Sequence, residues 1–199
     1  MRASHGGFAR DTWPSRGHGR LRAMEVMLRC EVPDVPGRLA TVAGAIAEAG
    51  GDIQAVEVVQ ATHGRATDDI WIQTGDMISV VAHIEALEDI TLVHTGPSRG
   101  LPGDATARLA TGSDALLSGA MSPEHGLPTL IGGLLRADSA ELQPPHDWPD
   151  KVNRRVLRFE VATGVLVLTR EYKFLEAEID RARQILLLCQ RAAAVGSRG

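Results

Sequence analysis

The sequence predicts an α+β fold for this chain of 199 residues. Stretches with the two-residue period of a strand alternate with stretches of helical period between residues 24 and 97. A segment rich in proline and glycine follows at 98–104. Because 44% of the residues are apolar, the chain can fill one ordinary core or two small ones. We therefore expect a domain at 24–97, a linker at 98–104 and a smaller helix-plus-antiparallel-sheet domain at 105–199.

The first predicted strand covers residues 25–32, where apolar and polar side chains alternate strictly. Pro33 and Pro36 cannot continue the hydrogen bonding of a strand, and Gly37 lets the backbone turn into a helix. This helix carries an apolar stripe at positions i, i+3, i+4, i+7 and i+8, and Gly50-Gly51 ends it. Such a stripe is expected to cover a sheet.

The rest of this half predicts, in order, a strand at 52–62, a turn at 63–65, a strand at 66–74, a helix after Asp76 and a strand at 90–96. Val56 and Val58 are expected to face inward. The order βαββαβ favours an antiparallel four-stranded sheet with both helices on one face, because right-handed crossovers cover the same side. This is the ferredoxin-like sandwich.

Three side chains of the third strand bear on function. Asp68 and Asp69 are adjacent, so they point to opposite faces and cannot share one proton-transfer task. We interpret them as solvated charges. Trp71 alternates with isoleucines and is expected on the face away from the helices, where a partner subunit or the linker would cover it.

The second half predicts the order α-α-β-β-β-α. Its predicted helices are at 105–120, 127–137 and 175–193, and two of its strands are at 152–159 and 161–170, after a loop at 144–149. Glycines 132 and 133 would weaken the second helix by about 1 kcal/mol each.

Composition excludes several classes of protein. No apolar run approaches the roughly 20 residues of a membrane-spanning helix. The Arg-rich first residues lack the apolar core of a secretory signal, so we expect a cytoplasmic protein with a disordered leader at 1–23, or a true start at Met24. The net charge of −4 predicts no nucleic-acid partner, and Cys30 and Cys189 are expected to be buried free thiols.

Motifs of catalysis are absent from the sequence. It has no Walker loop, no G-x-G-x-x-G after a strand, no G-x-S-x-G and no H-E-x-x-H. Its seven histidines have no Cys or His partner at metal-ligand spacing. We therefore expect a chain that is not an enzyme and that holds neither a cofactor nor a metal.

The loop before the first helix has the chemistry of a binding site. Unpaired N–H groups at the head of the helix dipole suit a small carboxylate. Asp34 beside this loop and Asp52 at the start of the second strand could together face an ammonium group, and the pair of charges predicts an amino acid. The alternative is that both features are ordinary turn chemistry.

The stretch "VPDVPGRLATVAGAIAEAGGDIQAVEVV" resembles the ACT domain, a regulatory amino-acid-binding module, over about residues 24–97. The resemblance implies a homodimer with a small amino acid bound between the proline-glycine loop of one copy and the start of strand two of another. The ligand-binding residues that it implies are Asp34, Val35, Pro36, Gly37, Arg38, Gly51, Asp52 and Ile53. Members that respond to amino acids often carry an amide at the positions where this chain has Asp34 and Asp52. The two aspartates therefore favour a cationic ligand, or a site that binds no ligand.

The stretch "GVLVLTREYKFLEAEIDRARQILLL" resembles the closing strand and helix of GAF-type sensor domains, here as a shortened relative. An ACT domain with such a half-domain resembles small stand-alone actinobacterial ACT proteins. The resemblances imply a regulatory amino-acid sensor. The alternatives are a ligand-free interaction module that serves as a regulatory subunit or adaptor, and a nucleotide sensor with a preformed pocket lined by the strands at 152–170.

Overall fold

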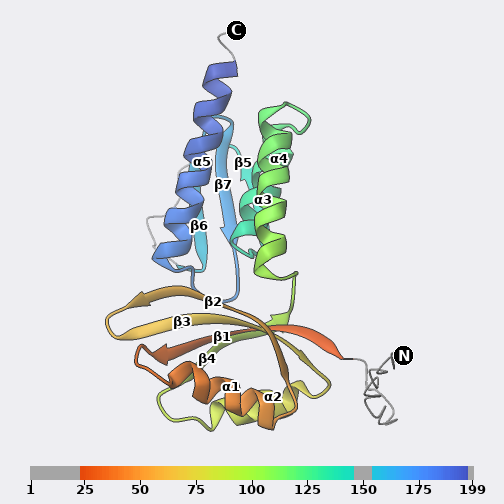
Figure 1. Cartoon of the computed structure of the whole chain (residues 1–199). Coiled ribbons are helices and arrows are strands. Elements are labelled where there is room, and N and C mark those ends of the chain that lie inside the picture. The colour runs from red at the N-terminus through yellow and green to blue at the C-terminus, as the bar shows by residue number, and fades with distance from the viewer. Residues whose placement is uncertain (1–22, 146–153, 197–199) are drawn as a thin grey trace, which may run out of the picture.

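The computed structural model describes residues 23–145 and 154–196, which form two units, one standing on the sheet of the other (Figure 1). The N-terminal unit contains β1 (Met24–Pro33), α1 (Arg38–Glu48), β2 (Asp52–Thr62), β3 (Arg65–Thr74), α2 (Met77–Glu85) and β4 (Thr91–Pro97). The C-terminal unit contains α3 (Pro102–Leu117), α4 (Pro123–Leu134), β5 (Ser139–Gln143), β6 (Val156–Val161), β7 (Gly164–Thr169) and α5 (Glu176–Gly196). The predicted α+β class is confirmed.

The N-terminal unit is the predicted antiparallel sandwich. Its strands follow the order β2-β3-β1-β4, and α1 and α2 cover the same face of the sheet (Figure 1). The core between helices and sheet includes Leu28, Val42, Ile46, Ile70 and Ile84. The opposite face of this sheet is where the C-terminal unit stands.

The prediction for β2 is wrong in one respect. Val56 and Val58 pair with Ile70 and Asp68 on the helix side, but they stay 39% and 56% exposed. The reason is that β2 is an edge strand, so a neighbouring strand flanks it on one side only. Two irregularities in its pairing with β3 also interrupt the simple alternation that the sequence predicts.

The C-terminal unit has the predicted element order. Its antiparallel sheet follows the order β5-β7-β6, and its core joins α4, the sheet and α5 through residues such as Ile131, Leu166, Leu168, Phe174 and Ala182. Helix α3 begins at Pro102, earlier than predicted, and buries no residue fully. None of the described helices is both long and apolar enough to cross a membrane.

Several predictions lie on residues outside the described ranges. They are most of the leader at 1–23, the loop at 146–149 and the first two residues of the strand predicted at 152–159. Met24 is the first residue of β1.

Candidate functional site

The loop between β1 and α1 is the first part of the candidate site. Gly37 has the left-handed conformation (φ 90°) at the N-cap of α1 and gives the helix no side-chain cap. Asp34, Val35, Pro36 and Gly37 are exposed, while Arg38 is half-buried and lies 3.6 Å from Asp89. The N–H groups of the first turn of α1 therefore meet no capping side chain and remain suited to an anion.

The start of β2 is the second part. A Cβ at Gly51 would lie 2.7 Å from Cγ2 of Ile46, so only glycine fits where α1 turns back to the sheet. Asp52 is exposed and accepts a hydrogen bond of 2.7 Å from Gln54, while Ile53 packs partly against the core. The Asp52 carboxylate is thus open to solvent at the end of an edge strand.

The two parts do not meet within one chain. Pro33, next to Asp34, pairs with Arg65 at the start of β3, whereas Asp52 pairs with Gln73 near its end. Eight residue steps of a strand, from 65 to 73, span about 27 Å. Asp34 and Asp52 of one chain therefore cannot face a single ammonium group. A ligand can contact both elements only if they come from different copies of the chain.

The face of the sheet away from the helices is closed by the C-terminal unit. Trp71 lies on this face as predicted, but it is only 2% exposed because the chain covers it with its own residues. It packs with Met27 and Tyr172, and the Arg136 guanidinium lies 4.5 Å from its ring centre. Neither a partner subunit nor the linker is needed to cover it.

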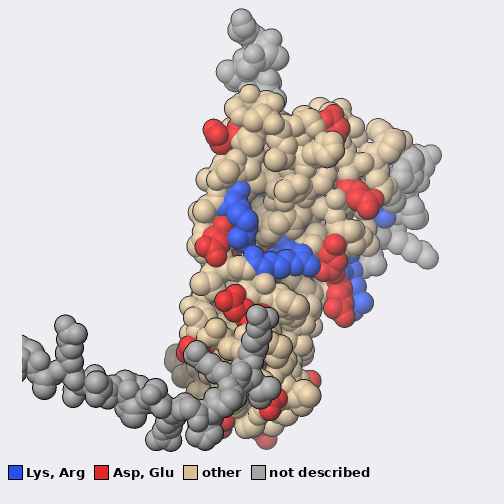
Figure 2. All heavy atoms as spheres, turned by 90° about the vertical axis from the view of Figure 1, so that its right-hand side faces the viewer, with Lys and Arg blue, Asp and Glu red and all other residues tan. Residues whose placement is uncertain are grey.

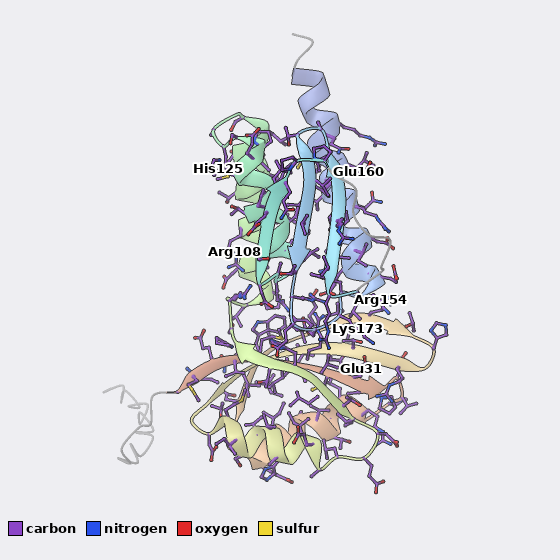
Figure 3. The ribbon with its side chains drawn as sticks, turned by 180° about the vertical axis from the view of Figure 1, so that it is seen from behind. Glu31, Arg108, His125, Arg154, Glu160 and Lys173 are labelled. Atoms are coloured by element: carbon purple, nitrogen blue, oxygen red, sulfur yellow. The ribbon has the colours of Figure 1, made fainter. Side chains whose placement is uncertain are left out.

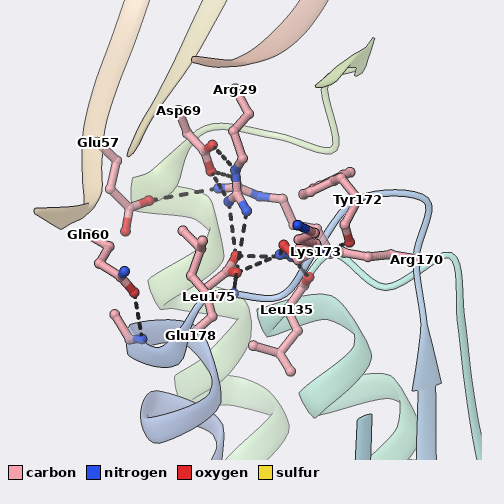
Figure 4. A network of polar contacts seen from close by, with 12 residues as sticks. Arg29, Glu57, Gln60, Asp69, Leu135, Arg170, Tyr172, Lys173, Leu175 and Glu178 are labelled. Carbon is pink, nitrogen blue, oxygen red and sulfur yellow. Dashed lines mark hydrogen bonds and ion pairs between the residues drawn. The ribbon is translucent and has the colours of Figure 1, made fainter. Parts of the chain in front are cut away.

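A buried ionic network joins the two units at this face (Figure 4). Arg29 of β1 donates two hydrogen bonds to Asp69 of β3, at 2.6 and 2.8 Å, and two to Glu178 of α5, at 3.3 and 2.9 Å. Arg170 donates to the same Glu178 at 2.9 and 2.5 Å, and Arg136 donates to Asp69. The interpretation of Asp69 as a solvated charge is therefore wrong.

Aromatic rings enclose the cations of this network. The guanidinium carbons of Arg29 and Arg170 lie 4.9 and 4.1 Å from the ring centre of Tyr172. His94 stacks on the same ring with centres 4.2 Å apart. Such contacts stabilise a cation that has lost its water.

Glu178 also fixes the start of α5. It accepts a hydrogen bond of 2.8 Å from the N–H of Leu175, and Gln60 of β2 accepts one of 3.2 Å from the N–H of Ala177. Burial raises the pKa of Glu178, but the hydrogen bonds and charges of Arg170 and Arg29 outweigh it and lower that pKa to about 2. The first turn of α5 is therefore held by residues of both units.

This network as a whole has no signature in the sequence, because its members lie up to 149 residues apart. The local signal was the pair Arg29 and Asp69, which the βαββαβ order places opposite one another on neighbouring strands. A cation opposite an anion on neighbouring strands predicts an ion pair, but such pairs are common on exposed faces, so the pair does not predict that this face is covered.

A groove of about 970 Å³ lies between the two units. Figure 3 shows Glu31 on its sheet side, with Lys173 and Arg154 on the side of the C-terminal unit. From the segment 152–170 it takes only Arg154 and Arg155, so it is not the strand-lined pocket that a nucleotide sensor requires. Among the described residues, no group of three His, Cys, Asp or Glu side chains is placed to hold a metal.

Charge on the face of the molecule in Figure 2 is mixed rather than segregated. On the face in Figure 2, Lys and Arg side chains form a short band at the level where the units meet, with acidic side chains beside it. Arg99 and Asp138, for example, lie 3.3 Å apart. This face therefore presents no extended basic surface of the kind that binds nucleic acid.

Two of the solved structures that resemble this chain are similar over most of its length. An unknown protein from Galdieria sulphuraria is 9% identical, covers 85% of this chain and 93% of its own, and has a TM-score of 0.37. The ligand-free regulatory subunit of aspartate kinase from Thermus thermophilus is 14% identical, covers 83% and 94%, and has a TM-score of 0.36. These scores are too low to establish a shared overall fold.

A search of the curated proteins finds no match to this chain. Residues 26–91, about a third of the chain, match the ACT domain family. The N-terminal unit therefore has an ACT-like fold, followed by a second region of helices and a three-stranded sheet.

Proposed function

We propose that this chain is a non-enzymatic, cytoplasmic regulatory protein whose ACT domain binds an amino acid at a homodimer interface. The match of residues 26–91 to the ACT domain carries the proposal. The uncapped first turn of α1 supports it, since it leaves backbone N–H groups for the ligand carboxylate.

The homodimer that we propose forms through β2. The C-terminal unit already covers the open face of the sheet, so a second copy cannot stack there. Strand β2 is an edge strand of 11 residues, and its exposed Val56 and Val58 favour burial against another chain. Antiparallel pairing of two β2 strands brings the end of one strand to the start of the other. It thereby places the Asp34–Arg38 loop near Asp52 of the partner subunit.

Replacing Val58 by arginine is expected to convert the dimer to a monomer. The substitution puts a charge into the apolar centre of the proposed interface, so the dimer dissociation constant should rise at least about tenfold. Analytical ultracentrifugation of the full chain measures it. Ile78→Arg is the matched control, because Ile78 is also an exposed apolar residue but lies on α2. A dimer dissociation constant that Val58→Arg leaves unchanged would exclude β2 as the interface.

Ligand binding is tested by a thermal-shift screen of the full chain against the standard amino acids and common nucleotides. A ligand that binds only the folded state stabilises it by about 2.7 kcal/mol at a hundredfold excess over its Kd. We expect one amino acid to raise the Tm, and Asp34→Ala and Asp52→Ala to abolish the rise. The exposed Asp114→Ala serves as the control. If no amino acid shifts the Tm, the sensor proposal fails.

The route from the ligand to the second unit is also part of the proposal. Strand β1 runs from Arg29 into the Asp34–Arg38 loop, and Arg29 binds the glutamate that fixes the start of α5. A ligand that favours one arrangement of the loop therefore biases the contacts of α5 through β1. The shift in the free-energy difference between the two arrangements of the loop cannot exceed the difference in the ligand's binding free energy for them.

A second candidate is a ligand-free interaction module that acts as a regulatory subunit or adaptor. The observation that favours it is on α5, where Leu187 and Leu188 are 39% and 52% exposed. An amphipathic helix with exposed leucines is suited to binding another protein. The absence of any thermal shift, together with specific binding of one partner protein, would support this candidate. The GAF-like relationship of the second unit stays a prediction.

A further inference from the structure

A cavity of about 280 Å³ lies where the linker, the C-terminal unit and β2 meet. Four arginines from four separate segments line it: Arg99 of the linker, Arg108 of α3, Arg136 after α4 and Arg181 of α5. Glu57 of β2 is the one carboxylate among the described residues that line it. In a chain with a net charge of −4, this cavity is therefore a local concentration of positive charge.

Main-chain carbonyls hold two of these guanidinium groups in place. Arg99 donates a hydrogen bond of 2.7 Å to the carbonyl of Ala137, and Arg108 donates one of 3.2 Å to the carbonyl of Arg99. A Cβ at Gly100 would lie 3.0 Å from Nη1 of Arg108, so this glycine leaves room for the guanidinium. Arg99 also pairs with Asp138 at 3.3 Å, but Arg108 forms no ion pair with any described residue. A neutral carbonyl fixes the position of Arg108 without compensating its charge.

Glu57 compensates only part of the remaining positive charge. Arg181 donates a hydrogen bond of 3.2 Å to it, and Nη2 of Arg136 lies 3.8 Å from it. Arg136 also pairs with Asp69, but Asp69 is shared with Arg29. The carboxylates of the described residues therefore leave an excess of cations at the cavity. Because each guanidinium has five N–H groups, those that these contacts do not use are available to a ligand.

The chemistry of the cavity suits a phosphate group. Guanidinium groups recognise carboxylate and phosphate oxygens through paired N–H groups. A phosphate monoester carries about two negative charges and three acceptor oxygens, so it compensates more of the excess than one carboxylate does. The volume of about 280 Å³ is just below the range of roughly 300–1,000 Å³ that holds drug-sized ligands, which limits the ligand to a small molecule. Leu109 and Leu134 line the same cavity and offer apolar contacts to the rest of that molecule.

We infer that this cavity is a second ligand site, which binds the phosphate group of a small phosphorylated metabolite. The site lies within one chain and shares no residue with the proposed amino-acid site, so both ligands can be bound at once. Its arginines belong to the linker and the C-terminal unit, while Glu57 belongs to the sheet on which that unit stands. A bound phosphate therefore links the segments that meet at the junction of the two units.

The test is isothermal titration calorimetry of the full chain with pyrophosphate, at an ionic strength held constant with potassium chloride. We expect saturable binding, and Arg108→Gln should weaken it by about tenfold, the order expected for one charge-assisted hydrogen bond. Because Arg108 is exposed and has no ion pair, the Tm of the ligand-free variant should equal that of the wild type. Arg183→Gln is the matched control, since Arg183 is an exposed arginine of α5 that pairs with Asp180 outside the cavity. It should bind pyrophosphate like the wild type.

A variant of opposite sign separates recognition from a merely structural role. Glu57→Gln removes the negative charge that faces the ligand but keeps an acceptor oxygen for Arg181, so it should tighten pyrophosphate binding by about tenfold. Absence of saturable binding to the wild type, weaker binding by Glu57→Gln, or equal losses in Arg108→Gln and Arg183→Gln would overturn the site. Tighter binding of citrate than of pyrophosphate would overturn the assignment to phosphate. None of these results bears on amino-acid binding, so the sensor proposal succeeds or fails separately.

Discussion

Replacing Arg29 by methionine is expected to lower the free energy of unfolding by about 3–5 kcal/mol, the range measured when one partner of a buried ion pair is removed. The side chain of Arg29 is almost completely buried and makes four hydrogen bonds to two carboxylates. Burial lowers its pKa, but Asp69 and Glu178 raise that pKa above the ordinary value, so the guanidinium stays charged. Methionine would keep much of the side-chain volume of arginine, but it would remove the cation that binds both Asp69 and Glu178.

Urea denaturation followed by circular dichroism measures the effect on the full chain. Arg183→Met is the matched control, because Arg183 forms an exposed ion pair with Asp180 on α5 and such pairs contribute only about 0–1 kcal/mol. A loss below about 1 kcal/mol for Arg29→Met would mean that Arg136 and Arg170 suffice to compensate the carboxylates. The network would then not join the units as we describe.

The stability of the protein is expected to fall in acid because of Glu178. Its pKa is about 2 in the folded chain, below the ordinary value of 4.5. A lowered pKa contributes stability that is fully present above the unfolded value and is lost as the pH falls from 4.5 towards 2. A difference of this size corresponds to about 3 kcal/mol, since each pKa unit is about 1.4 kcal/mol.

Glu178→Gln should therefore be less stable than the wild type at pH 7, and the difference should shrink as the pH falls towards 2. Urea midpoints between pH 7 and pH 2 measure both curves. Glu176→Gln is the control, because Glu176 lies on the same helical turn but forms an exposed ion pair with Arg154. Parallel pH profiles for wild type and Glu178→Gln would show that Glu178 does not have the lowered pKa.

The arrangement of the N-terminal unit could be predicted because its signals are local. Alternation in β1, the proline-glycine turn and the apolar stripe of α1 each depend on neighbours in the sequence. The handedness of crossovers then leaves few ways to join the elements. The same local signals failed at Val56 and Val58, because exposure on an edge strand depends on what lies beside the strand.

The candidate site was predictable only in part. The loop at 34–38 and the start of β2 were identified from residue types, but their separation along β3 required the pairing register. Asp68 and Asp69 show the limit most clearly, since both were interpreted as solvated and both are buried. The sequence predicted correctly that they point to opposite faces, because that follows from the period of a strand.

The sequence by itself determined the element order, the α+β class and the chemistry of the β1–α1 loop, since each follows from patterns within a few residues. The tertiary structure alone decided that the C-terminal unit covers Trp71, that Arg29 meets Glu178 and that Oδ1 of Asp68 has no hydrogen-bond partner among the described residues. The reason is physical: burial and ion pairing depend on which surfaces come together. In this chain those surfaces are brought together by residues as far apart as 149 positions.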